Sequence, residues 1–125
     1  MSETPARLLV VDDEANQRRM LAGILSRAGY EVVTAEGGQQ ALAALAEARF
    51  DTLLTDQRMP GMDGLELLDR ARSAQHDLPV VLMIGYSEGE SSARLAELRP
   101  DAFVHKPFHP DLLIETLEAL LEEDV

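Results

Sequence analysis

Acidic side chains follow two short apolar runs in this chain, and the only lysine follows a third. Asp12 and Asp13 come directly after Leu8–Val11, Asp56 ends the run at 52–55, and Lys106 follows the run at 102–105. Three carboxylates that share one pocket repel one another and raise one another's pKa unless a cation joins them. Mg²⁺, or Mn²⁺ in its place, takes oxygen ligands of this kind. A carboxylate nucleophile beside a metal ion and a lysine can accept a phosphoryl group, and we expect Asp56 to be that nucleophile.

The stretch at 50–64 is the one around which the chain is organised. It begins as a short apolar run, reaches Asp56, and then breaks at Met59-Pro60-Gly61. A buried strand that ends in an acid and a turn presents a charged group at the carboxyl edge of an α/β sheet. Loops at Gly61 and Gly85 would let backbone N–H groups approach phosphoryl oxygens.

Each of these motifs also has a purely structural interpretation. Asp12 and Asp13 would suit the start of a helix, where acids complement the helix dipole. Met59-Pro60-Gly61 would serve as a simple turn. The motifs become specific because each follows an expected strand.

The pattern of apolar residues predicts five strands that alternate with five helices. Strands are expected at 8–11, 30–35, 52–55, 78–84 and 102–105, and helices from 15 to a stop at Gly29, over 39–48, after a cap at Asp63, through Leu95 and Leu98 to Arg99, and over 111–122. This alternation is typical of a parallel sheet with helices on both faces. Right-handed crossovers place the carboxyl ends of all the strands at one edge. The acids, Lys106 and the Ile84-Gly85 pair should therefore meet there.

Helical spacing also gives expectations for packing. We expect Met20, Ile24 and Leu25 to face the core from the first helix, and Leu112 to share the apolar side of the last. Phe108 is expected in the core, and the methionines at 59, 62 and 83 in the core or in loop packing.

Composition restricts the class of protein. The 125 residues, 46% of them hydrophobic, predict one domain over 1–125 with a disordered lead at 1–6. A formal charge of −12 argues against direct binding to nucleic acid or to anionic membranes. The lack of cysteine excludes disulfides. No secretory signal and no apolar run of about 18 residues is present, so we expect a cytoplasmic protein.

Three motifs together resemble a known family. Val-Val-Asp-Asp-Glu (10–14), Thr-Asp-Gln-Arg-Met-Pro-Gly-Met-Asp-Gly (55–64) and Lys-Pro-Phe (106–108) are similar to those of the receiver domains of bacterial two-component response regulators, chemotaxis regulators among them. The resemblance covers about 7–121. It implies a flavodoxin-like α/β fold, with five parallel strands in the order 2-1-3-4-5.

The resemblance also implies roles for individual residues. Asp56 would be the phosphoacceptor, Asp13 a direct Mg²⁺ ligand, and Asp12 a ligand through water. The backbone carbonyl of Arg58 would be a third protein ligand, and Lys106 would pair with the phosphoryl group.

Further positions would carry the signal onward. Phe103 stands where the family has an aromatic switch residue, and Arg58 and Tyr86 stand where the rate of phosphate loss is tuned. The donor would be a phosphohistidine on a sensor histidine kinase or a phosphotransfer protein. The output would be a downstream protein or an output domain. The fourth helix, fifth strand and fifth helix would form the face used for partners or dimers.

Two positions depart from the family's pattern. Ile84 stands where the family usually has the switch Thr or Ser, although the small residue that follows, Gly85, is present. One hydrogen bond to a charged group is worth about 1.5–3 kcal/mol, so its loss would remove much of a switch. We therefore hypothesise that Asp56 accepts phosphate while transmission through Phe103 is weakened or rewired. The second departure is Arg99-Pro100, where Gly-Ala is more usual; it alters the expected output face.

Two other classes of function remain at this stage. One is a pseudo-receiver, an interaction module that works without phosphorylation, which Ile84 favours. The other is an enzyme, either a flavin protein or a phosphoaspartate phosphatase. The flavin protein would need a hydroxyl-rich phosphate loop after the first strand, and the phosphatase would need a second acid where Arg58 stands. A receiver would catalyse only its own phosphorylation and dephosphorylation.

Overall fold

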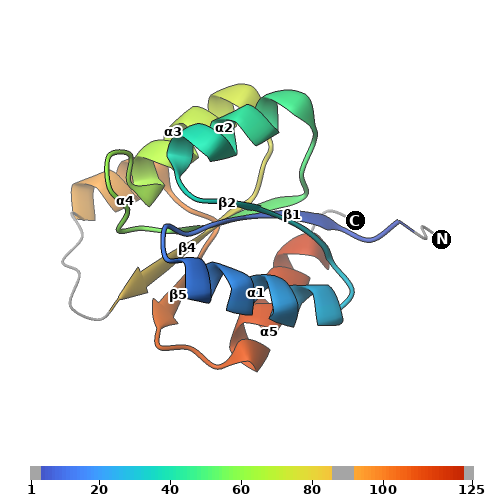
Figure 1. The fold of residues 1–125 in the computed structure, drawn as a ribbon. Helices are drawn as coiled ribbons and strands as arrows, with labels where there is room; N and C mark the ends of the chain where they lie inside the picture. Colours follow the sequence, from blue (N-terminus) through green and yellow to red (C-terminus); the bar gives the residue numbers. More distant parts are fainter. Residues whose placement is uncertain (1–3, 86–91, 123–125) are drawn as a thin grey trace.

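The chain folds as five parallel strands that alternate with five helices (Figure 1). The structure, a computed structural model, describes residues 4–85 and 92–122; Tyr86 and most of its loop lie outside this range, as do the first three residues of the expected lead. The strands are β1 (Arg7–Val11), β2 (Glu31–Ala35), β3 (Thr52–Asp56), β4 (Val80–Gly85) and β5 (Ala102–Lys106), and the helices are α1 (Ala15–Arg27), α2 (Gly38–Glu47), α3 (Gly64–Ala74), α4 (Ser92–Leu98) and α5 (Pro110–Glu122). The sheet order is β2-β1-β3-β4-β5, which confirms the expected flavodoxin-like fold.

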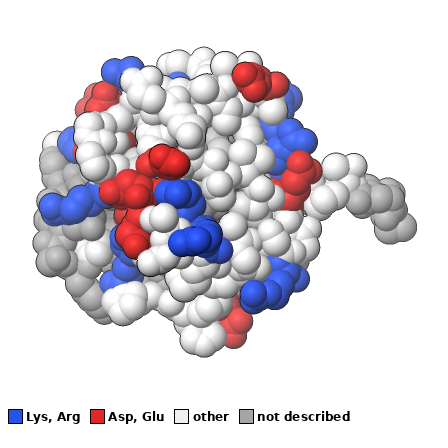
Figure 2. Space-filling view, viewed as in Figure 1, with Lys and Arg blue, Asp and Glu red and all other residues white. Residues whose placement is uncertain are grey.

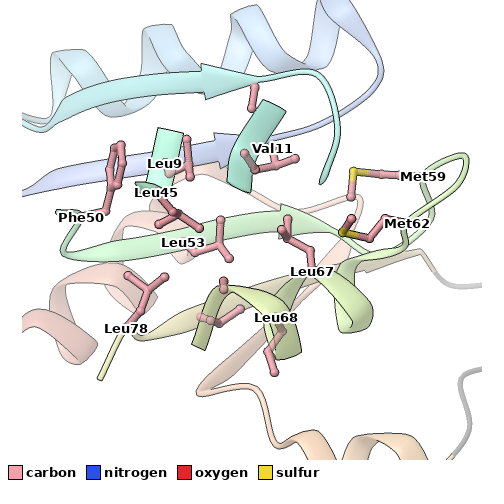
Figure 3. Close-up of a cluster of buried hydrophobic side chains, with 14 residues drawn as sticks. Leu9, Val11, Leu45, Phe50, Leu53, Met59, Met62, Leu67, Leu68 and Leu78 are labelled. Carbon is pink, nitrogen blue, oxygen red and sulfur yellow. The ribbon is translucent and has the colours of Figure 1, made fainter. Parts of the chain in front are cut away.

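The central strands are buried on both faces. In β1, Leu9 and Val11 pack with α2 and α3, whereas Leu8 and Val10 pack with α1 and α5. Figure 3 shows the first of these cores, where Leu9 and Leu53 from the sheet meet Leu45 and Leu67 from the helices. This two-sided burial explains why the strands appear in the sequence as continuous apolar runs rather than as alternating ones.

Helices α2, α3 and α4 cover one face of the sheet, and α1 and α5 cover the other (Figure 1). None of the helices in the described ranges has the length and apolar character needed to cross a membrane.

Two packing predictions were wrong by one helical position. Met20 is 52% exposed and Leu112 is 49% exposed, while the next residues, Leu21 and Leu113, are fully buried. Successive residues on a helix point about 100° apart. The buried rows are therefore Leu21 with Leu25, and Leu113 with Leu117. Phe108 is partly buried against the same core, and Met59, Met62 and Met83 are buried as expected.

The end of α4 has an unusual backbone. The helix stops at Leu98, close to the expected boundary, and Arg99 then adopts a φ of 48°. Glycine is the usual residue in this left-handed conformation after a helix, because it has no Cβ to clash. Arg99 therefore holds a turn that other sequences make with glycine.

Candidate functional site

The register of the sheet brings the expected acids together. Val11 of β1 pairs with Thr55 of β3, so Asp12 and Asp56, the next residue along each strand, adjoin at the carboxyl edge. Asp13 follows, and ligand oxygens of the three carboxylates all lie within 4.8 Å of one another. Asp12 is fully buried and Asp56 is 5% exposed, whereas Asp13 is open to solvent. Two buried anions and one exposed anion therefore share a small volume.

Lys106 reaches this cluster from the end of β5, the edge strand that is separated from β3 by β4. Its backbone pairs with Gly85 at the end of β4, and its Nζ donates a hydrogen bond of 2.8 Å to Asp56 Oδ1. The Asp56 side chain is 7% exposed and that of Lys106 is 24% exposed. Partial shielding from water strengthens such a charge-assisted bond. The Lys106 ammonium group therefore pairs with Asp56 inside the acidic cluster.

Asp12 is held by residues that the sequence analysis did not identify. The Glu14 N–H donates to Asp12 Oδ1 at 2.9 Å, and the Gln17 side-chain amide donates to Oδ2. Arg18 donates to the Asp12 carbonyl oxygen at 2.7 Å. Burial raises the pKa of the Asp12 carboxyl above its ordinary value, and the charge of Asp56 adds to the rise, while the Glu14 N–H opposes it. One indication of these contacts was present in the sequence: positions 17 and 18 lie in the first turns of the helix that follows Asp12, within reach of its side chain and carbonyl.

Helix α3 begins in direct contact with the backbone of Asp56. A Cβ placed on Gly64 would lie 2.5 Å from the Asp56 carbonyl oxygen, 2.9 Å from Gln57 Cα and 2.7 Å from a Leu82 methyl group. The Gly64 N–H also donates to the Gln57 carbonyl at 2.9 Å. The start of α3 can approach the acceptor strand this closely only because residue 64 has no side chain.

Gln57, which is 4% exposed, connects the loop after Asp56 to the same helix. Its side-chain oxygen accepts a 2.9 Å bond from Leu65 N, and its amide nitrogen donates to Asp63 Oδ2 at 3.2 Å. Its own N–H donates to the Met83 carbonyl of β4 at 2.9 Å. Gln57 thus fixes the loop to both β4 and α3.

Asp63 caps α3, as expected, and also binds α4. Its Oδ1 accepts a 2.9 Å bond from Glu66 N, and the Arg94 guanidinium donates to both of its oxygens at 3.0 Å. Burial raises the pKa of the Asp63 carboxyl, but the Arg94 and Glu66 bonds outweigh this effect and hold the pKa below its ordinary value. The Arg94 bonds were not foreseen, because the two residues are 31 positions apart.

The remaining predicted positions lie around this centre. Ile84 is 6% exposed and packs with Leu65 and Leu82, so no hydroxyl stands at the end of β4. Gly85 is the last residue of β4 and is half-buried. Phe103 is 41% exposed on β5, and Arg58 is exposed in the loop after Asp56. Tyr86 lies outside the described residues.

On the surface, acidic side chains gather beside basic ones on the side toward which the strands point (Figure 2). This edge of the sheet holds several buried or half-buried acids and one lysine, and two helices begin beside it. Such an arrangement is suited to bind a cation and a phosphoryl group. The fold and the site together define an α/β domain with a candidate phosphoacceptor aspartate at the carboxyl edge of its sheet.

Comparison with known proteins identifies the family. A family model described as the response regulator receiver domain matches residues 8–118, so this chain belongs to the receiver-domain family of two-component signalling. The acidic cluster is typical of the Mg²⁺ site of these domains and is consistent with a phosphoacceptor aspartate.

Individual proteins that are similar to this chain support the same family assignment. The phosphate regulon transcriptional regulatory protein PhoB of Pseudomonas aeruginosa is 36% identical over 116 residues, which cover 91% of this chain and 51% of that protein. Regulatory protein AtoC of Escherichia coli is 40% identical over 107 residues, or 86% of this chain and 23% of that protein. Chemotaxis protein CheY4 of Vibrio cholerae has a TM-score of 0.87 at 34% identity, with 94% of this chain and all of that chain covered. The chain thus spans about half the length of PhoB and less than a quarter of the length of AtoC.

We predict that Gly64→Ala destabilises the fold by about 1–3 kcal/mol, because the new Cβ must displace backbone atoms of Asp56 and Gln57. Gly23→Ala is the matched control. Its Cβ meets only the Arg27 side chain, at an ordinary 3.6 Å, and replacing glycine inside a helix should stabilise by about 0.5–1 kcal/mol. Urea unfolding followed by circular dichroism measures both. Equal stabilities for the two variants would contradict the close contact.

Proposed function

We propose that Asp56 accepts a phosphoryl group from a phosphohistidine of a sensor histidine kinase or a phosphotransfer protein. The observation that carries this proposal is the 2.8 Å bond from Lys106 to Asp56 within a cluster of three carboxylates. A lysine placed there can bind the Asp56 carboxylate before the transfer and the phosphoryl oxygens after it. Residues 1–125 are taken as one receiver domain in this proposal.

The reaction is a displacement at phosphorus. A carboxylate oxygen of Asp56 attacks the phosphorus atom as the bond from phosphorus to the donor imidazole nitrogen breaks. The imidazole keeps the electron pair of that bond. It leaves as a neutral ring if its other nitrogen carries a proton, and otherwise it becomes neutral by taking up one proton from water. Asp56 then carries an acyl phosphate. Lys106 stabilises the negative charge that gathers on the transferred oxygens.

A divalent ion fits the residues of this site. Two of the three carboxylates are buried, and the ammonium group of Lys106 pairs with one of them, Asp56. Asp13 and Asp56 would bind Mg²⁺ or Mn²⁺ directly, Asp12 would bind it through water, and the Arg58 carbonyl would complete the protein ligands. The ion would neutralise the pocket so that an anionic donor can approach. We assign the tuning of the rate of acyl phosphate hydrolysis to Arg58 and Tyr86, the two positions that the family resemblance implies.

The proposed output is a protein contact. Phe103 of β5 lines an open groove of about 500 Å³ together with Leu95 and Ala96 of α4 and with Arg99 and Pro100 of the turn between them. This groove belongs to the α4 and β5 part of the face on which we propose partner binding. An apolar groove beside an exposed aromatic residue suits a protein partner, an output domain or a second copy of the chain. The charge of −12 does not suit direct contact with nucleic acid or membrane. We propose a cytoplasmic location, which is typical of receiver domains.

A second candidate function is a pseudo-receiver that binds its partner without phosphorylation. The buried, fully apolar setting of Ile84 favours it, because no hydroxyl is available there to sense a phosphoryl oxygen. The intact acid and lysine set favours the first function, which we adopt.

We predict that incubation with acetyl phosphate and Mg²⁺ adds the mass of one phosphoryl group, and that Asp56→Asn abolishes the gain. Intact-mass spectrometry measures both proteins, and a chelator should prevent the gain in the wild type. A folded, metal-binding wild type that gains no mass would instead support the pseudo-receiver.

We also predict that Phe103 does not swing fully inward when Asp56 is modified. Ile84 is packed against Leu65 and Leu82 and cannot move toward a phosphoryl oxygen to form a hydrogen bond. Crystal structures with and without beryllofluoride, a phosphoryl mimic, test this directly. A buried Phe103 together with a shift of the loop after β4 toward the mimic would contradict the hypothesis that transmission through Phe103 is weakened.

A further inference from the structure

Helices α3 and α4 are joined at the point where α3 touches the proposed phosphoacceptor. Asp63 caps α3 and at the same time accepts two 3.0 Å bonds from Arg94 of α4. The Asp63 side chain is 29% exposed and that of Arg94 is 41% exposed. A guanidinium that binds both oxygens of one carboxylate fixes direction as well as distance.

A continuous set of close contacts leads from Asp56 to this ion pair. The Asp56 carbonyl oxygen lies against Gly64, with no room for a Cβ, and Gln57 binds both Leu65 and Asp63. A displacement of the backbone at Asp56 or Gln57 therefore cannot be absorbed within the loop and must move the start of α3. The Asp63 carboxylate moves with it, because it caps that helix turn.

Away from Asp63, the described contacts of α4 are apolar along the helix and polar at its C-terminal end. Leu95 and Leu98 pack on the cluster of Leu65, Leu82 and Ile84, and such apolar contacts fix the direction of a helix less strictly than hydrogen bonds do. At the far end, Arg72 donates to the Leu98 carbonyl at 2.6 Å and to Asp101 at 2.8 Å. With this end fixed, movement at Arg94 would tilt α4 about Leu98.

We propose that Arg94 is the positioning residue through which the state of Asp56 reaches α4, by way of Gln57, Gly64 and Asp63. This route would stand in for the hydroxyl that Ile84 lacks. The inference rests on the proposed phosphorylation of Asp56.

Phosphorylation supplies a sufficient perturbation. It replaces the single negative charge of the Asp56 carboxylate with the charge of a phosphoryl group, about −1.5 to −2, beside Asp12 and Asp13, and it draws Lys106 from the carboxylate toward the new oxygens. The loop that begins at Gln57 must adjust to three additional oxygen atoms. Because Leu95 lines the groove beside Phe103, a tilt of α4 would change the shape of the surface offered to a partner.

The test is a set of amide NMR spectra of the ¹⁵N-labelled chain before and during incubation with acetyl phosphate and Mg²⁺, with intact mass recorded on the same samples. The variants are Arg94→Gln and Asp63→Asn. The asparagine keeps a capping oxygen for α3 but loses the charge. The matched control is Arg70→Gln, which breaks an exposed arginine–carboxylate pair between Arg70 and Glu66 that lies within α3 and does not reach α4.

In the wild type and in Arg70→Gln we expect shifts both at the start of α3 (64–67) and in α4 (93–98). In Arg94→Gln and Asp63→Asn, phosphorylation and the α3 shifts should persist while the α4 shifts are lost. The persisting α3 shifts also show that each variant is folded. If one variant fails to fold, the other variant tests the role of the ion pair.

Phosphorylated wild type without α4 shifts would overturn this inference alone, and so would α4 shifts that survive in a folded variant. A wild type that gains no mass would overturn the proposed function and this inference with it.

Discussion

The mutual repulsion of three carboxylates at one sheet edge is the constraint on which the rest of this structure depends. Their oxygens lie within 4.8 Å of one another, and Asp12 and Asp56 are almost without contact with water. Lys106 supplies one positive charge against three negative ones. Three carboxylates this close together suit a domain that attracts a cation and then accepts a phosphoryl group.

The fold is rigid where it has to resist this repulsion. The strands that carry Asp12 and Asp56 are buried on both faces, and their register places the two acids side by side. Hydrogen bonds from Glu14 and Gln17 hold Asp12 in place. At Gly64 helix α3 closes onto the acceptor strand without a gap. The same rigidity explains how a displacement at Asp56 can move residues outside the pocket, because closely packed neighbours leave little room for it within the pocket.

The sequence was informative wherever the structure depends on local pattern or on strand ends. Continuous apolar runs predicted the strands, and the topology that follows from their alternation with helices brought Asp56 and Lys106 to one edge. Pattern was less reliable for the phase of a helix, where Met20 was chosen over its neighbour Leu21 although both are apolar. The bond from Arg94 to the α3 cap could not be predicted, because its geometry exists only once both helices have packed.

The claim that the three acids form one cation site is tested most directly by Mn²⁺ binding, followed by the electron paramagnetic resonance signal of the free ion. The wild type should bind Mn²⁺, Mg²⁺ should displace it, and Asp13→Asn should weaken binding strongly. Asp69→Asn, which removes an exposed acid on α3 away from the site, should bind as the wild type does. Equal affinity in the wild type and both variants would contradict the account, because the acids would then act only as structural caps and surface charge.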